Sequence, residues 1–462
     1  MSALPPTPDA ILQVVCRAID AMIAAADAHH GLFPSMIDPA THRMLEESPE
    51  AIRGQRDGDR AHQGSNLMHD HPLLLTMYGL SGALNRNVYA DAADRYLSRF
   101  AAHCMKTPNG LLPWGEHAYW HLRNDAIGCG MSEANPAWPH GAVHDHLRGA
   151  PKWLWSRLAA LNADGVRRHA LGLDWHLKDG LPLEYSRHAY VDEPTRPPRL
   201  TGAGDSSCDF PRHCGFYVFD VAFAFSRTPD DELRTHLERW IDYWWDKRPA
   251  SGPLPSDSRP IPGQRPKPSC SQTISLACSL IEAARIAGEV DSALAATMRM
   301  RADDYIERCI TPLTEEMQSA SHWDGGYGGP NLAAGAFKAM TAYVLCGRDP
   351  LRAAAAHVAE RYAETDLPRD GSFPASSPGL ALSLFASLYE HAHEPRWRDA
   401  GLRLAGEVCA IMFEHALPRG ATGIDWYESQ LGAPLLLHAL ARIALLADDV
   451  EHCPLEQDDS YR

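Results

Sequence analysis

Apolar residues recur at helical spacing along most of the chain, and the alternation typical of strands is rare. One such segment, Ile11–Ala26, follows a proline-rich start, and another runs from Pro72 to Leu84. Apolar, Ala/Leu-rich segments of the same kind follow at 152–161, 216–225, 272–287, 332–346, 378–391 and 432–447. This periodicity predicts helices. A minor strand or two is expected only near 181–191.

Turns built around glycine recur between these helices, each interval long enough for one helical hairpin and a loop. The turns are Gly31–Pro34, Gly110–Pro113, Gly180–Pro182, Gly252–Pro255, Gly325–Tyr327, Gly371–Pro374 and Gly423–Trp426. Repeated helical pairs form solenoids or closed rings. We therefore predict an all-α fold, an (α/α) toroid or barrel of six or seven helical hairpins with few short strands. The plainer alternative is that these turns only terminate helices.

The same helical pattern continues on both sides of the proline-rich stretch Pro253–Pro268, which therefore reads as a long loop rather than a linker. We predict a single (α/α) barrel domain over residues 1–452, whose loops share one mouth. Residues 453–462 are expected to form a polar C-terminal tail.

Charged residues make up 22% of the chain, hydrophobic residues make up 45%, and the formal net charge is −16. A surface of this charge argues against nucleic acid and anionic membranes as partners. The start lacks the features of a signal peptide, and no apolar run reaches the roughly 18 residues of a membrane span. The 11 cysteines show no CxxC spacing. These features predict a cytoplasmic protein with reduced thiols and no membrane contact.

Three short segments carry the candidate chemistry: Trp114–His117, His144–His146 and Tyr185–His188. They supply imidazoles and carboxylates, which suit a divalent metal of the Mn, Zn and Ni class. Arg187 stands directly beside His188, which suggests that metal and guanidinium serve one reaction.

Other roles for these residues stay open. His117 and His121 would share a face if Gly115 opened a helix, and this is a metal-ligand spacing. Asp145 could instead cap the helix predicted over 151–158.

A rival constellation, His69–Pro72, stands directly before a strongly apolar helix. There Asp70 would be a good N-cap and Pro72 a good first helical residue, so we interpret the cluster as structural.

Aromatic residues beside the first candidate ligand, Trp114 and Tyr119, are predicted to stack on a sugar. Paired carboxylates for a glycosidase could come from the repeat turns. The candidates are Asp324, Asp370, Asp425 and Glu428.

At these segments the chain resembles polysaccharide lyase family 2, the metal-dependent pectate lyases with an (α/α)7 barrel. The resemblance rests on four stretches of sequence. They are Gly110–His117, Val143–Leu147, Asp174-Trp175 and Tyr185–His188. It implies a lyase that acts on acidic oligosaccharides and contains a divalent metal, with Mn as the first choice and Zn, Ni, Co or Ca as alternatives.

The resemblance also implies roles for single residues. His117 and His188 would be metal ligands and Arg187 the base. Asp145 would take the place of the family's glutamate ligand, although it is one methylene shorter. A second arginine would bind the substrate carboxylate, and its candidates are Arg212, Arg259 and Arg265.

A metal ion beside a base also suits the chemistry of β-elimination. β-Elimination removes a proton α to a carboxylate, and a cation on that carboxylate stabilises the developing charge. We therefore predict a metal-dependent lyase that cleaves uronic-acid glycosidic bonds, with pectate fragments as the expected substrates. The alternatives are an epimerase or isomerase of the N-acylglucosamine 2-epimerase type, an inverting glycoside hydrolase, and a non-catalytic carbohydrate-binding toroid.

Overall fold

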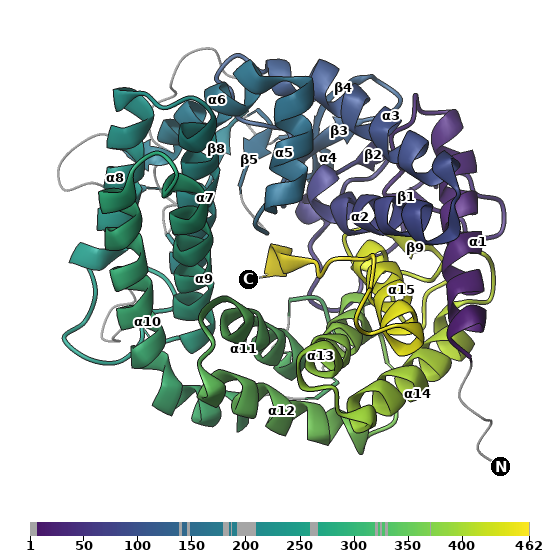
Figure 1. Cartoon of the computed structure of the whole chain (residues 1–462). Coiled ribbons are helices and arrows are strands. Elements are labelled where there is room, and N and C mark those ends of the chain that lie inside the picture. Colours follow the sequence, from purple (N-terminus) through teal and green to yellow (C-terminus); the bar gives the residue numbers. More distant parts are fainter. Residues whose placement is uncertain are drawn as a thin grey trace.

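Helices alternate between an outer and an inner ring along the chain (Figure 1). The structure is a computed structural model. It describes residues 7–137, 141–145, 148–178, 184–185, 187–191, 209–258, 267–318, 322–323, 326–328, 331–369 and 371–461. Within these ranges the chain forms fifteen α-helices and nine short strands. Without the five-residue α4 (Gly130–Ala134), fourteen helices remain, which is seven outer–inner pairs. The predicted all-α toroid is confirmed.

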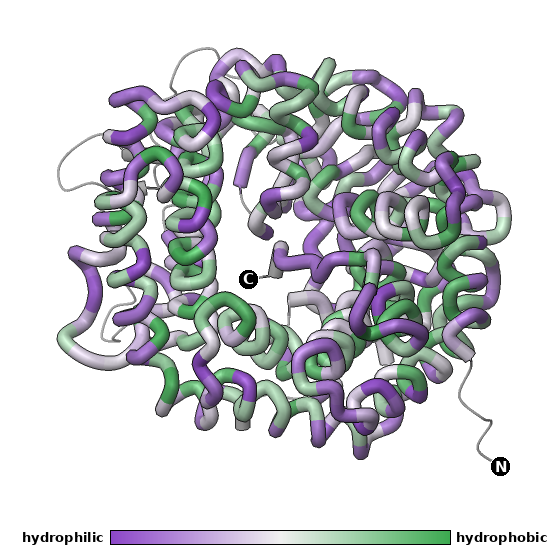
Figure 2. Tube along the Cα trace, viewed as in Figure 1, coloured by the Kyte–Doolittle hydropathy of each residue, from purple (hydrophilic) through white to green (hydrophobic). Residues whose placement is uncertain are grey.

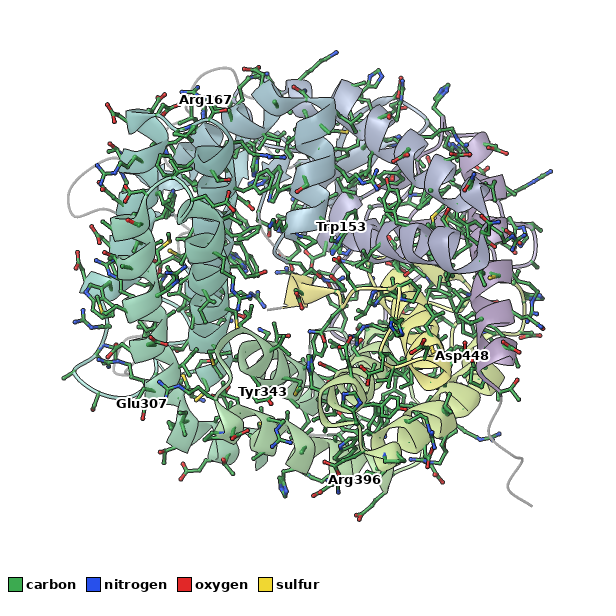
Figure 3. The ribbon with its side chains drawn as sticks, viewed as in Figure 1. Trp153, Arg167, Glu307, Tyr343, Arg396 and Asp448 are labelled. Atoms are coloured by element: carbon green, nitrogen blue, oxygen red, sulfur yellow. The ribbon has the colours of Figure 1, made fainter. Side chains whose placement is uncertain are left out.

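The outer ring carries the more polar helices. They are α1 (Pro8–Asp27), α3 (Asn87–His103), α6 (Ala163–Gly172), α8 (Asp231–Asp246), α10 (Ser292–Gln318), α12 (Asp349–Ala363) and α14 (Pro395–Met412). Their solvent-facing side chains include Glu307 and Arg396, which point away from the ring (Figure 3).

The inner ring carries the apolar helices. They are α2 (Leu67–Leu84), α5 (Lys152–Leu161), α7 (Pro211–Arg227), α9 (Cys270–Ala287), α11 (Leu332–Cys346), α13 (Ser376–Ala392) and α15 (Ala433–Asp448). The ring closes where α1 packs against α14 and α15, and α15 packs against α2.

Burial explains why the two rings differ in sequence. Inner helix α15 is covered on all sides and buries 14 of its 16 residues. Outer helix α12 buries only Leu351, Ala355, Val358, Ala359 and Tyr362, a stripe at helical spacing. Figure 2 shows the same contrast, because hydrophobic stretches run along the inner helices. All the predicted helices exist, and seven of the eight lie in the inner ring.

One predicted helix start is wrong. Helix α2 begins at Leu67, with the Asn66 side chain accepting from the Met68 N–H, rather than at Pro72 after an Asp70 cap. Asp70 is instead buried inside the helix, where its carboxylate accepts from Tyr96 (2.8 Å) and Ser65 (3.3 Å). The cluster is therefore structural, as interpreted, but Asp70 acts through hydrogen bonds inside the helix and not as its N-cap.

Short antiparallel strands join the loops at one end of the ring. The strands are β1 (Met36–Ile37), β2 (Gly64–Ser65), β3 (Ala118–His121), β4 (Ala126–Cys129), β5 (Val143–His144), β6 (Leu177–Lys178), β7 (Glu184–Tyr185), β8 (Ala189–Tyr190) and β9 (Tyr427–Glu428). They pair as β1–β9, β2–β3–β4, β5–β8 and β6–β7. Strands β7 and β8 confirm the minor strands expected near 181–191.

Two of the predicted glycine turns lie side by side at this end. Gly371 and Gly423 both have positive φ (+98° and +78°), and a bridge joins Pro374 to Ala421 just beyond them. Since β1 also pairs with β9, turns far apart in sequence meet there, as the prediction of a shared mouth requires.

The predicted polar tail turns back into the ring (Figure 1). Asp458 and Ser460 are buried, and Asp458 Oδ1 lies 3.3 Å from His71 Nε2. The Ser460 carbonyl accepts from the Gly149 N–H at 3.2 Å. Polarity here reflects buried hydrogen bonds rather than exposure to solvent.

Among the described helices, none combines the length and the apolar run needed to cross a bilayer. The ten cysteines in the described ranges are all free thiols, as predicted.

Candidate metal centre

The structure brings together the three predicted metal ligands, His117, Asp145 and His188. Each offers one ligand atom, and these atoms all lie within 4.8 Å of one another. Two imidazole nitrogens and a carboxylate oxygen form a donor set that suits Mn, Zn or Ni. The ligand types and their spacing fit a divalent cation.

A two-stranded ladder aligns two of these ligands. Strand β5 pairs with β8 in the register Val143↔Tyr190 and His144↔Ala189. The next position in this antiparallel register sets Asp145 opposite His188. The pairing therefore bridges the 43 residues that separate the two ligands in sequence.

The third ligand is held by a neighbouring loop. His117 Nδ1 lies 3.0 Å from the Gly58 carbonyl oxygen and 3.3 Å from Asp59 Oδ1. Because a carbonyl only accepts, Nδ1 carries the proton and Nε2 keeps its lone pair for a cation. Outer partners of this kind commonly fix metal-ligating histidines.

Glu116 forms a second group with the same histidine. Ligand atoms of Asp59, Glu116 and His117 also lie within 4.8 Å of one another, and Glu116 Oε2 is 3.7 Å from His117 Nε2. Arg56 bridges the two carboxylates, at 2.7 Å from Asp59 and 3.0 Å from Glu116. Glu116 is thus a further carboxylate beside the imidazole of His117.

Burial and neighbouring charges shift the pKa values of the three carboxylates at this site. Burial, and then the charge of Glu116, raise the pKa of Asp145 well above its usual range and that of Asp59 to about 6. Burial would also raise the pKa of Glu116, but His117, Arg56 and Arg187 lower it. A divalent cation would relieve this repulsion.

Gly115 allows the first two ligand segments to meet. It has φ +103°, and a Cβ there would lie 2.0 Å from the Asp145 carbonyl oxygen and 2.6 Å from its Oδ1. The same approach lets the Glu116 N–H donate to Asp145 Oδ1 at 2.6 Å.

Gly115→Ala is therefore expected to lower the free energy of unfolding by roughly 1–3 kcal/mol from backbone strain, with further loss from the clash. Chemical denaturation measures this. Gly82→Ala is the matched control, because that helical glycine has nothing within 4 Å of the added Cβ. Equal unfolding free energies for the two variants would contradict the close approach.

Arg187 lies beside the cluster, as predicted. Its guanidinium carbon is 5.6 Å from the centre of the Phe210 ring, and its charge lowers the pKa of both Glu116 and Asp145. It forms no ion pair within the described ranges, so its guanidinium remains available to a ligand.

A cavity of about 370 Å³ opens next to the cluster, within the size range of small-molecule sites. Glu116 and Arg212 both line it, which supports Arg212 as a substrate-binding candidate. Arg259 and Arg265 lie outside the described residues.

The prediction that Trp114 and Tyr119 stack on a sugar is wrong, because both rings are buried. Trp114 is fully buried between Phe100 and Trp155, and its indole N–H donates to His144. Tyr119 is 1% exposed, and its hydroxyl donates to Glu133. Their rings form core contacts and cannot face a sugar.

Two further expectations change. Gly115 opens no helix: His117 directly precedes strand β3, and His121 at its end faces Glu133 at 4.0 Å instead of the cluster. Asp145 caps no helix either, since α5 begins after Pro151 without a side-chain cap.

The carboxylates predicted as a possible glycosidase pair do not come together in the described part of the chain. Glu428 is fully buried and pairs with Arg60 at 2.9 Å. Asp425 lies in an exposed turn, whereas Asp324 and Asp370 lie outside the described residues.

Comparisons with known proteins identify the fold. Neither a protein-family model nor a curated protein sequence matches the chain. An α-1,2-mannosidase from Trichoderma reesei is similar in structure, with 11% identity over 96% of this chain and 94% of that chain and a TM-score of 0.53. This match shows a shared fold.

Two weaker matches are a cellobiose 2-epimerase from Spirochaeta thermophila and a D-mannose isomerase. The epimerase has 13% identity, coverage of 94% and 96%, and a TM-score of 0.43. The isomerase has 10% identity, coverage of 92% and 96%, and a TM-score of 0.41. None of these three is named as a lyase, so the resemblance to polysaccharide lyase family 2 stays a prediction from the motifs.

Proposed function

We propose that the protein is a metal-dependent lyase that cleaves uronic-acid oligosaccharides by β-elimination. One observation carries the proposal: the ligand atoms of His117, Asp145 and His188 lie within 4.8 Å of one another, with Arg187 beside them. Imidazole and carboxylate ligands hold the cation, and Mn is the first choice.

When bound, the cation neutralises the substrate carboxylate and so favours loss of the neighbouring proton. His117, Asp145 and His188 hold it, while Asp59 and the Gly58 carbonyl orient His117.

Arg187 acts as the neutral guanidine, a form that a cation bound beside it would favour, and takes the C5 proton. The C5–H electron pair forms the C4=C5 double bond, and the C4–O bond breaks. The leaving oxygen takes a proton from water, and the hydroxide formed takes the proton back from Arg187. Arg212 faces the same cavity and binds a substrate carboxylate.

Incubation with oligogalacturonides and Mn²⁺ tests the proposal. The expected result is a rise in ultraviolet absorbance from the 4,5-unsaturated product, and its loss in EDTA. Absence of this product with every uronate polymer, with and without added metal, would reject the lyase.

A second candidate is a metal-independent sugar epimerase or isomerase, of the same kind as the cellobiose 2-epimerase and D-mannose isomerase described above. One observation favours it: the His117 and His188 rings lie side by side in an edge-to-face arrangement, with centres 5.1 Å apart. Two such imidazoles could remove and return a proton. Activity on a neutral disaccharide that survives EDTA, with a saturated product, would select this candidate.

A further inference from the structure

Lys338 is a buried lysine in the inner helix α11. It is 6% exposed, whereas Lys106, Lys152, Lys247 and Lys267 are all exposed. Its Nζ donates to Ser271 Oγ at 3.2 Å, and within the described ranges it forms no ion pair. Burying an ammonium group without a counter-ion costs free energy of folding. A lysine at this position is therefore better explained by function than by stability.

Arg212 is a second cation without an ion pair in the described ranges, and it is partly buried. It lies in the first turn of α7, its Nε has no hydrogen-bond partner in the described part of the chain, and Nη2 is 3.3 Å from His213 Nε2. The positive charge of Arg212 disfavours protonation of Lys338. The negative charges of Glu116 and Asp145 favour the charged form of Arg212. The two cations therefore extend from the metal centre into the ring.

The nearest acidic candidate has another task. Glu316 exerts a charge effect on Lys338, but its carboxylate accepts from the backbone N–H groups of Cys270 (2.7 Å) and Ser271 (3.3 Å) at the start of α9. It stabilises a helix N-terminus and leaves the lysine without a paired carboxylate.

Both cations line the cavity that Glu116 borders at the metal centre. Phe216 and Leu380 contribute apolar surface to the same wall. A space with apolar surface, two cations that form no ion pair in the described ranges and the candidate metal ligands at its edge fits a sugar chain with more than one acid group.

We propose that Lys338 and Arg212 form a second carboxylate subsite, which binds the acid group of the uronate unit next to the one held at the metal centre. This inference rests on the proposed function and deepens it. It specifies that the neighbouring unit must also be acidic, so chains of at least two free uronates are the substrates.

The protonation of Lys338 is consistent with this role. Burial, and then the charge of Arg212, lower the pKa of Lys338 to about 7, while Cys278 and Glu316 act in the opposite direction. A bound carboxylate favours the charged form. The preference for a diuronate over a monouronate is therefore expected to grow as the pH falls from 8 to 6.5, and to be independent of pH in Lys338→Arg.

Calorimetric titration tests the subsite in an Arg187→Ala background, where substrate is bound but not consumed. The probes are digalacturonate, its neutral dimethyl ester, galacturonate and inorganic phosphate, each with Mn²⁺ and in EDTA. Lys338→Met is expected to weaken digalacturonate at least tenfold and galacturonate less than twofold. Lys338→Arg should retain the affinity, and Lys152→Met is the exposed-lysine control.

A stability measurement separates this role from a structural one. Lys338→Met is expected to raise the unfolding temperature of the free protein, because a buried charge is removed. A lower unfolding temperature would mark Lys338 as structural and overturn the proposal.

The remaining outcomes are equally decisive. Unchanged digalacturonate binding, equal loss for galacturonate, equal binding of the dimethyl ester, or a Lys338-dependent site for phosphate alone would each overturn the subsite. Lys338-dependent binding of digalacturonate without turnover by the parent protein would reject the lyase and leave the subsite standing.

Discussion

Replacing His117 or His188 by alanine is expected to abolish binding of the proposed metal and, with it, the proposed lyase activity. Each imidazole is one of three candidate ligands whose atoms lie within 4.8 Å of one another. Since loss of an outer partner alone typically weakens metal binding by about 10–100-fold, loss of a ligand should cost more than about 100-fold. Elemental analysis of the purified variants, followed by titration with Mn²⁺, measures both the content and the affinity.

His121→Ala is the matched control for these variants. His121 lies only four residues from His117, at the far end of β3, and faces Glu133. It should keep its metal. The metal centre would be wrong if His117→Ala and His188→Ala retained the metal content of the parent, or if all three histidine variants lost it equally.

The fold was predictable where burial dictates composition. Inner helices such as α15 are apolar on every face, so their limits follow closely from sequence. Helix α11 matched its predicted range 332–346, because Asn331 caps its start and Gly347 (φ +71°) ends it. Outer helices such as α12 show only a narrow apolar stripe among charges, and the apolar pattern alone did not identify them.

The grouping of His117, Asp145 and His188 was predictable because these residues lie in motifs, but the residues that support them were not predictable. Glu116 stands in the same motif as His117, and the carboxylate itself was the available signal. Asp59 lies 58 residues before His117, and only the folded loop brings its Oδ1 to 3.3 Å.

Lys338 illustrates a different limit. Its neighbours in the sequence are those of an ordinary apolar helix, and nothing local marks it as buried. The ring brings it to the same cavity as Glu116. Conversely, Trp114 adjoins a candidate ligand in sequence but points into the core, because neighbours along a tight turn can face opposite ways.

Arg187→Ala is expected to lower kcat by about 10²–10⁴-fold, the range for loss of a general base. The metal should be retained, because Arg187 is not part of the ligand cluster. KM should change much less than kcat, since the proton transfer occurs only in the transition state. Steady-state kinetics on oligogalacturonides, with elemental analysis of the same preparation, measures all three quantities.

The control and the conservative variant sharpen this prediction. Arg167→Ala removes a guanidinium from the outer helix α6 (Figure 3). Arg167 pairs there with Asp230 and Glu232, and kcat should be unchanged. Arg187→Lys keeps the positive charge but not the reach of the guanidinium. Recovery of kcat in this variant would show that an amine can replace the guanidinium here, because lysine can both carry charge and take a proton. A kcat for Arg187→Ala within threefold of the parent, with full metal content, would exclude Arg187 as the base and turn attention to His117 and His188, the two imidazoles whose ring centres lie 5.1 Å apart at the same site.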